Sequence, residues 1–139
     1  MRHFYSLNEF STEQIAEFVD SALAFKENPS SDVLERRQIA LLFLNQSLRT
    51  RCSFEVATRE LGGDVSTLDA ETLFALETEF GKRMDGASAE HVKEATGVLS
   101  RYFSALGLRS FASGEDQQAD LLDTTFTTFL EHAKIPVFN

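Results

Sequence analysis

The sequence predicts an α/β domain, with three layers, a parallel sheet of about four strands and helices on both faces. Residues 38–45, QIALLFLN, are apolar at nearly every position, as in a central strand covered on each side. Segments typical of strands alternate along the chain with segments of helical spacing. This alternation favours parallel strands joined by right-handed crossovers. With 139 residues, 42% of them hydrophobic, we expect one domain spanning residues 1–139.

The first half of the chain predicts helix, strand, helix and strand. Ser11 and Gln14 have the spacing of a capping box, and apolar residues then recur on one face, which predicts a helix over residues 12–27. The strand at 38–45 leads into a helix that opens near Thr50 and stops at the glycine pair 62–63. A short strand is expected in DVSTLD, which follows that pair.

The second half repeats the alternation after an irregular stretch. Residues 70–88 show no clean period, and long segments of this kind in compact domains are often functional. The polar stretch ASGEDQQAD, residues 112–120, is expected to be a turn-rich loop. The remaining elements are predicted from their periodicity: a helix over 89–103, a strand over 105–111, a helix over 122–133 and a strand over 135–139.

Charge and composition exclude several classes of partner. Lys and Arg number 13 against 22 Asp and Glu, and a net charge of −9 disfavours nucleic acid and anionic lipid. The longest apolar run is only six residues, and MRHFYSLNEF lacks the apolar core of a signal peptide, so a cytoplasmic protein without a membrane span is expected. One cysteine, Cys52, and three scattered histidines predict no metal and no cofactor.

The stretch QSLRT predicts an anion site, because it lies between the carboxyl end of a strand and the start of a helix. Open α/β sheets bind ligands at this edge. The helix N-terminus presents free N–H groups, to which Ser47 and Thr50 add hydroxyls and Arg49 adds a guanidinium. Arg109 ends another predicted strand and is expected on the same edge. From the residues alone, solvated surface arginines are an equally good interpretation.

The same residues resemble a known family. FLNQSLRTRCSFEVATRELGG is similar to the carbamoyl phosphate motif S-x-R-T-R of the transcarbamylases, with its S-F-E and Gly-Gly. M-D-G, E-H and R-S-F follow in the order and spacing of the N-acetylornithine and N-succinylornithine transcarbamylases. The resemblance covers nearly the whole chain. It implies the amino-terminal carbamoyl phosphate-binding domain of the aspartate/ornithine carbamoyltransferase superfamily.

The resemblance also implies roles for single residues. Carbamoyl phosphate would be held by Ser47, Leu48, Arg49 and Thr50 together with Arg109. Of these, Arg49, Thr50 and Arg109 would act in catalysis by positioning and electrostatics. Arg51 belongs to the motif and is expected to be structural.

Two further positions concern the second substrate. In the acylornithine enzymes a tryptophan before M-D-G reaches the active site of the neighbouring subunit in a trimer. By spacing, that position is Phe74 in this chain. The alternative is that Phe74 packs in the hydrophobic core. In the family, the residue two positions before His91 distinguishes between the acetyl and succinyl groups of the substrate. This chain has Ala89 there. A carboxylate there would repel a succinyl chain, so alanine favours succinylornithine over acetylornithine.

The function implied is transfer of a carbamoyl group from carbamoyl phosphate to the side-chain amine of an N-acylornithine in arginine biosynthesis, by a homotrimer. The family continues with a glutamate, an H-P-C-Q segment and an amino-acid-binding domain, none of which occurs in these 139 residues. We therefore expect the chain to be inactive alone. The alternatives are a stand-alone module for carbamoyl phosphate or another phosphometabolite, an inactive remnant, and, within the family, ornithine carbamoyltransferase.

Overall fold

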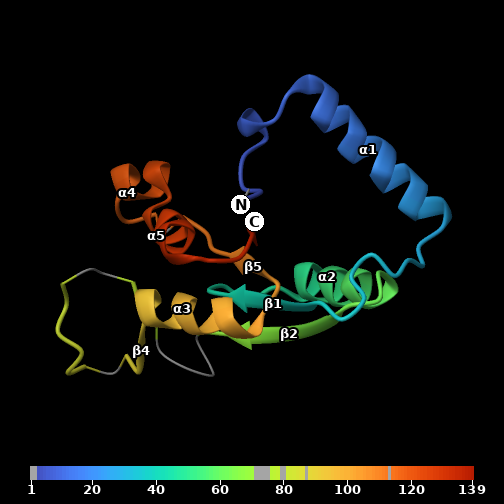
Figure 1. The fold of residues 1–139 in the computed structure, drawn as a ribbon. Coiled ribbons are helices and arrows are strands. Elements are labelled where there is room, and N and C mark those ends of the chain that lie inside the picture. The colour runs from blue at the N-terminus through green and yellow to red at the C-terminus, as the bar shows by residue number, and fades with distance from the viewer. Residues whose placement is uncertain (1–2, 71–75, 79–80, 87, 113) are drawn as a thin grey trace.

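A four-stranded parallel sheet lies at the centre of the computed structural model, which describes residues 3–70, 76–78, 81–86, 88–112 and 114–139 (Figure 1). The strand order is β2-β1-β5-β6. β1 is bonded in parallel on both sides, to β2 and to β5, as its unbroken apolar run predicts. The strands are β1 (Gln38–Phe43), β2 (Asp64–Asp69), β5 (Ala105–Arg109) and β6 (Val137–Phe138).

Helices cover both faces of the sheet, which confirms the predicted three-layer α/β architecture. On one face Leu42 and Leu106 pack with residues of α3 (Val92–Tyr102) and α5 (Thr124–His132), among them the fully buried Phe126 and Phe129. On the other face Ile39, Leu41 and Phe43 form a second cluster, against which Phe138 packs. Phe54 of α2 (Leu48–Glu60) stacks on Phe138, so α2 lies on this second face.

Several boundaries differ from the prediction. β1 ends at Phe43, two residues early, and α2 begins at Leu48, two residues before the predicted start at Thr50. The shift arises because Ser47, not a later residue, caps the helix. The predicted loop at 112–120 contains the start of a short helix, α4 (Gln117–Leu122), whose first turn is capped by the Asp116 carboxylate. The irregular stretch contributes β3 (Leu76–Glu77), which pairs with β4 (Glu90–His91) in a separate small sheet.

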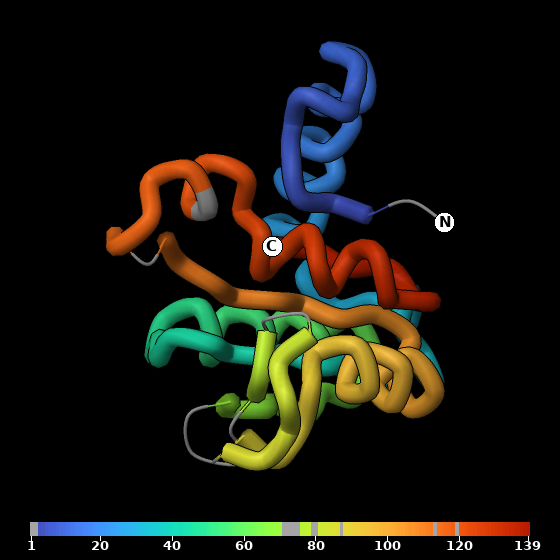
Figure 2. The backbone as a smooth tube through the Cα atoms, turned by 90° about the vertical axis from the view of Figure 1, so that its left-hand side faces the viewer, coloured from blue at the N-terminus to red at the C-terminus, as the bar shows by residue number. Residues whose placement is uncertain are grey.

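The first helix, α1 (Thr12–Glu27), stands apart from the rest of the chain. Its bounds and the capping box of Ser11 and Gln14 match the prediction. None of its residues is buried, and Figures 1 and 2 show it extending away from the sheet. Aromatic contacts from Phe18 to Phe4 and Phe10 join it to the amino-terminal segment, which contains the 3₁₀ turn Leu7–Glu9. The apolar face that predicts α1 is therefore covered only in part, by this amino-terminal segment, among the described residues.

Two kinds of feature are absent from the described residues. None of their helices is long and apolar enough to cross a membrane. Within the same ranges, no group of three or more His, Cys, Asp or Glu side chains is arranged to hold a metal ion.

Candidate functional site

The candidate site lies at the carboxyl edge of the sheet, where β1 and β5 end side by side. Phe43 and Arg109 are partners in the parallel register, and the backbone N–H of Leu44 donates to the carbonyl of Arg109 at 2.9 Å. Residues 44–47 then lead directly into α2. The sheet therefore brings the QSLRT loop and the R-S-F segment to one place, as the pattern of strands and helices predicts.

The N-terminus of α2 is built to present hydrogen-bond donors. Ser47 is the N-cap, and its Oγ accepts the backbone N–H of Thr50 at 3.3 Å. The other first-turn N–H groups of a helix have no intrahelical partner, and the helix dipole makes this end positive. The first turn of α2 contains no acidic residue. An anion placed here would meet donors and positive potential, with no carboxylate in that turn to oppose it.

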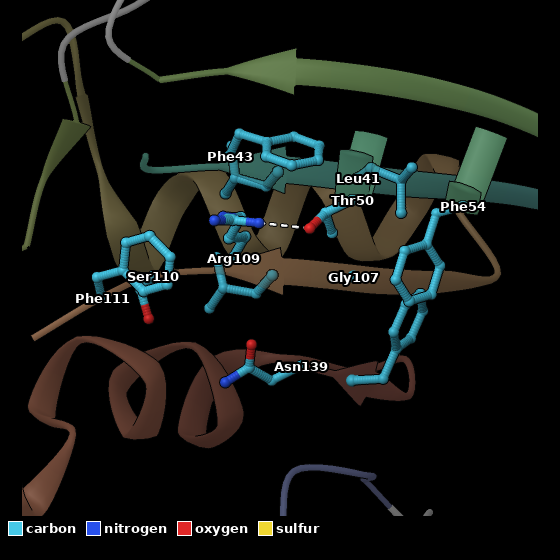
Figure 3. A pocket seen from close by; sticks show the side chains of 12 residues that line it. Leu41, Phe43, Thr50, Phe54, Gly107, Arg109, Ser110, Phe111 and Asn139 are labelled. Carbon is cyan, nitrogen blue, oxygen red and sulfur yellow. Dashed lines mark hydrogen bonds between the residues drawn. The ribbon is translucent and has the colours of Figure 1, made fainter. Parts of the chain in front are cut away.

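Arg109 is held over this helix end from two directions (Figure 3). Its Nη1 donates a short hydrogen bond to the Thr50 hydroxyl. The ring of Phe111 lies 4.5 Å from the guanidinium carbon, a cation–π contact. The Nε of Arg109 is buried and has no hydrogen-bond partner among the described residues. A buried N–H without a partner is costly, so this part of the guanidinium is held in place by the packing around it and not by a hydrogen bond of its own.

The arginines of α2 differ in whether they have an acidic partner. Arg51 donates from Nε to the Glu55 carboxylate at 2.9 Å, and Arg59 lies 3.8 Å from the same carboxylate. Arg49 is exposed and makes no ion pair or hydrogen bond with any residue that the structure describes. Hydrogen bonds from Thr67 and then Arg51 lower the pKa of Glu55, which keeps this carboxylate charged. Arg51 is therefore neutralised locally, whereas Arg49 and Arg109 retain donors for a ligand.

Two hollows flank Phe43 at this edge. One, of about 180 Å³, is lined by Thr50, Arg109 and Phe111 and by apolar residues that include Leu41 and Phe54. The other, of about 320 Å³, is lined by Ser47, Leu48 and Arg51 with residues of β2. The first combines a polar end with an apolar wall, and the second opens at the cap of α2. Both are concave and small, as a site for a compact anion requires.

Ala89, the other predicted site residue that the structure describes, lines neither hollow. Phe74 lies outside the described residues. Ala89 is exposed next to β4, which pairs with β3 and not with the four-stranded sheet. His91 caps α3, with its Nδ1 accepting the backbone N–H of Lys93 at 3.2 Å. Sequence reasoning missed Asn45 and Phe111 at the site, although an aromatic residue two positions after Arg109 was a signal that was available.

Comparison with known proteins agrees with this geometry. The family profile described as "Aspartate/ornithine carbamoyltransferase, carbamoyl-P binding domain" matches residues 2–139. The chain belongs to this family. It is 33% identical to an N-acetylornithine carbamoyltransferase of Xanthomonas campestris over the whole chain, covering 41% of that relative. It is also 39% identical to an N-succinylornithine carbamoyltransferase of Bacteroides thetaiotaomicron, over 74% of this chain and 33% of the relative. The family member described here thus spans about two fifths, or less, of these relatives.

Solved structures show the same fold. An acetylornithine transcarbamylase complexed with acetylcitrulline superposes with a TM-score of 0.95 at 33% identity, over all of this chain and 42% of that one. A variant of N-acetyl-L-ornithine transcarbamylase in which one glutamate is replaced by alanine, complexed with carbamyl phosphate and N-succinyl-L-norvaline, gives the same TM-score at 34% identity. The four-stranded sheet and its helices are therefore those of the amino-terminal part of a carbamoyltransferase.

Proposed function

We propose that this chain binds carbamoyl phosphate at the N-terminus of α2. The observation that carries the proposal is the pair of arginines at this helix end: Arg49 has no partner among the described residues, and the Arg109 guanidinium, which has no acidic partner there, is held beside Thr50. The phosphate would lie against the first-turn N–H groups, with the hydroxyl of Ser47 and the main chain of Leu48 beside it. A bound phosphate would accept charge-assisted hydrogen bonds from Arg49 and Arg109. These contacts would be local, in a chain whose net charge is −9.

The reaction proposed for the enzyme containing this chain is carbamoyl transfer to the side-chain amine of an N-acylornithine. The amine attacks the carbamoyl carbon and loses a proton, and the bond to the phosphate oxygen breaks, so that phosphate leaves. Arg49, Thr50 and Arg109 would stabilise the charge that builds on the carbonyl oxygen and the departing phosphate. This chain therefore supplies positioning and electrostatics for one substrate.

The preferred acyl group in this proposal is succinyl. Ala89 is exposed and uncharged, so it leaves room for the free carboxylate of a succinyl chain. In support, the relative with one glutamate replaced by alanine has been solved with N-succinyl-L-norvaline. In the enzyme that contains this chain, Ala89→Glu is expected to move the ratio of kcat/KM towards the acetyl substrate. An unchanged ratio would remove Ala89 from the proposal.

The 139-residue chain is proposed to bind without turnover, because the glutamate, the H-P-C-Q segment and the amino-acid-binding domain with which the family continues are not among these 139 residues. Citrulline-type product from the purified chain would contradict this.

A cytoplasmic location and assembly into a homotrimer belong to the same proposal. The exposed free thiol of Cys52 is consistent with a reducing compartment, and the resemblance in sequence supports the trimer. Light scattering after gel filtration measures the oligomeric state.

Calorimetric titration with carbamoyl phosphate, and separately with inorganic phosphate, tests the binding. We expect saturable binding that Arg49→Ala weakens at least about tenfold, as expected for loss of a charge-assisted contact. The matched control is Arg101→Ala, which removes an exposed arginine from the last turn of α3 at the opposite edge of the sheet. Equal affinity in Arg49→Ala and Arg101→Ala, or no heat with the unaltered chain, would overturn the proposal.

A further inference from the structure

Asn45 connects the two loops that form the candidate site. It lies between β1 and α2, and its side-chain Oδ1 accepts a hydrogen bond from the backbone N–H of Phe111 at 2.9 Å. Phe111 follows β5 and is 66 positions away in the sequence. The register of the sheet already fixes the backbone as far as Arg109, through the bond from Leu44. The Asn45 side chain extends that connection two residues beyond the strand.

Phe111 in turn determines how Arg109 is presented. The residue is 64% exposed, so core packing does not hold its side chain in place. The ring nevertheless lies 4.5 Å from the Arg109 guanidinium and covers one side of it, while Thr50 bonds its Nη1. Because an exposed ring follows its backbone, the position of the Phe111 backbone governs this contact. That backbone is held by Asn45.

We propose that Asn45 is a positioning residue for the anion site. By holding the Phe111 backbone, it keeps the aromatic ring against Arg109, which fixes the guanidinium beside Thr50 in the first turn of α2. Asn45 itself need not touch the anion. The inference rests on the proposed function, since the ligand is taken to carry a phosphate group. It adds a residue that neither the motif nor the charge pattern singles out.

A thermodynamic cycle with inorganic phosphate as the probe tests this role. Asn45→Ala is expected to weaken phosphate binding about threefold to tenfold, the effect of losing one neutral hydrogen bond. In an Arg109→Ala background the same change is expected to have no further effect, because Asn45 acts through Arg109. Equal losses in both backgrounds would show that Asn45 supports the loop generally, and would overturn the inference.

A second measurement separates this inference from the proposed function, because it needs no ligand. Nuclear magnetic resonance of the Arg109 Nε–H group reports whether that group is ordered and protected from exchange with water. We expect a protected signal in the unaltered chain, its loss in Asn45→Ala, and its retention in Gln46→Ala, which removes the exposed neighbouring amide. A protected signal in Asn45→Ala would overturn the positioning role. Failure of the unaltered chain to bind phosphate would instead count against the proposed function.

Discussion

Arg109 donates a hydrogen bond to the hydroxyl of Thr50, a residue 59 positions earlier in the sequence. One residue ends β5 and the other lies in the first turn of α2, so the bond joins the two segments in which sequence reasoning placed the anion site. Arg51, in the same turn, is instead paired with Glu55. Arg49 and Arg109 have no acidic partner among the described residues, so both are available to an anion at the N-terminus of α2.

The Thr50 hydroxyl should matter for affinity more than for folding. Thr50→Val keeps the shape of the side chain but removes the acceptor for Arg109, so phosphate affinity is expected to fall about threefold to tenfold. Thr50→Ser keeps the hydroxyl and is the matched control, with an expected change of less than about twofold. Titration with inorganic phosphate measures both. Similar losses in the two variants would show that the hydroxyl alone does not account for the effect, and would contradict the prediction.

Gly107 is the position in β5 where a side chain is least tolerated. A Cβ built there would lie 2.7 Å from the Phe138 ring and 2.8 Å from the Leu41 side chain. Gly107→Ala should therefore destabilise the chain by about 1–3 kcal/mol through overpacking. Gly97→Ala is the control, since nothing lies within 4 Å of its added methyl in α3, and it should stabilise by about 0.5–1 kcal/mol. Urea unfolding followed by circular dichroism distinguishes the two, and equal midpoints would refute the packing argument.

Local patterns predicted most of the fold. The run at 38–45 indicated an interior strand because only a strand bonded and covered on both sides tolerates apolar side chains at every position. The capping box predicted the start of α1 because both partners lie within one turn. Boundaries near Ser47 and Asp116 were missed because several neighbouring residues are able to cap, and only the folded backbone selects one.

Part of the candidate site was also predictable from the pattern of strands and helices. The proximity of Thr50 and Arg109 was predictable because the carboxyl ends of neighbouring parallel strands meet at one edge, whereas their roles toward a ligand stay predictions. The open state of Arg49 and the pairing of Arg51 with Glu55 depend on which side of α2 each guanidinium takes, which residue spacing alone did not settle. Asn45 was missed because its partner is a backbone N–H 66 positions away, and no motif encodes such a contact.

The isolation of α1 predicts that its stability is local. Ser11 Oγ accepts the backbone N–H of Gln14 at 3.3 Å, and the Gln14 Oε1 accepts the backbone N–H of Ser11 at 3.1 Å. Ser11→Ala should therefore destabilise the helix by about 1 kcal/mol. Because none of the residues of α1 is buried, the sheet should not be affected. We expect faster amide hydrogen exchange in α1 and unchanged exchange in β1. Faster exchange in both elements would show that α1 folds together with the sheet.

Glu55 should make stability depend on pH in a defined window. Hydrogen bonds from Thr67 and Arg51 lower its pKa in the folded chain, whereas in the unfolded chain it titrates near the ordinary value of about 4.3. A carboxylate with a lowered folded pKa stabilises the fold fully above its unfolded pKa, and this contribution is lost as the pH falls through the folded pKa. Glu55→Gln should therefore be less stable than the unaltered chain at pH 7, with the difference shrinking below about pH 4.3.

The control for this prediction is Glu60→Gln. Glu60 is exposed in the last turn of the same helix, and its side chain makes no ion pair with the described residues. Exposed charges of this kind contribute little to stability, so this variant should unfold at nearly the same urea concentration as the unaltered chain at pH 7 and at pH 3.5. If the difference for Glu55→Gln were constant between these two pH values, its carboxylate would be stabilising the fold through shape and not through charge. The hydrogen bonds from Thr67 and Arg51 would then not be what holds the carboxylate in its ionised form.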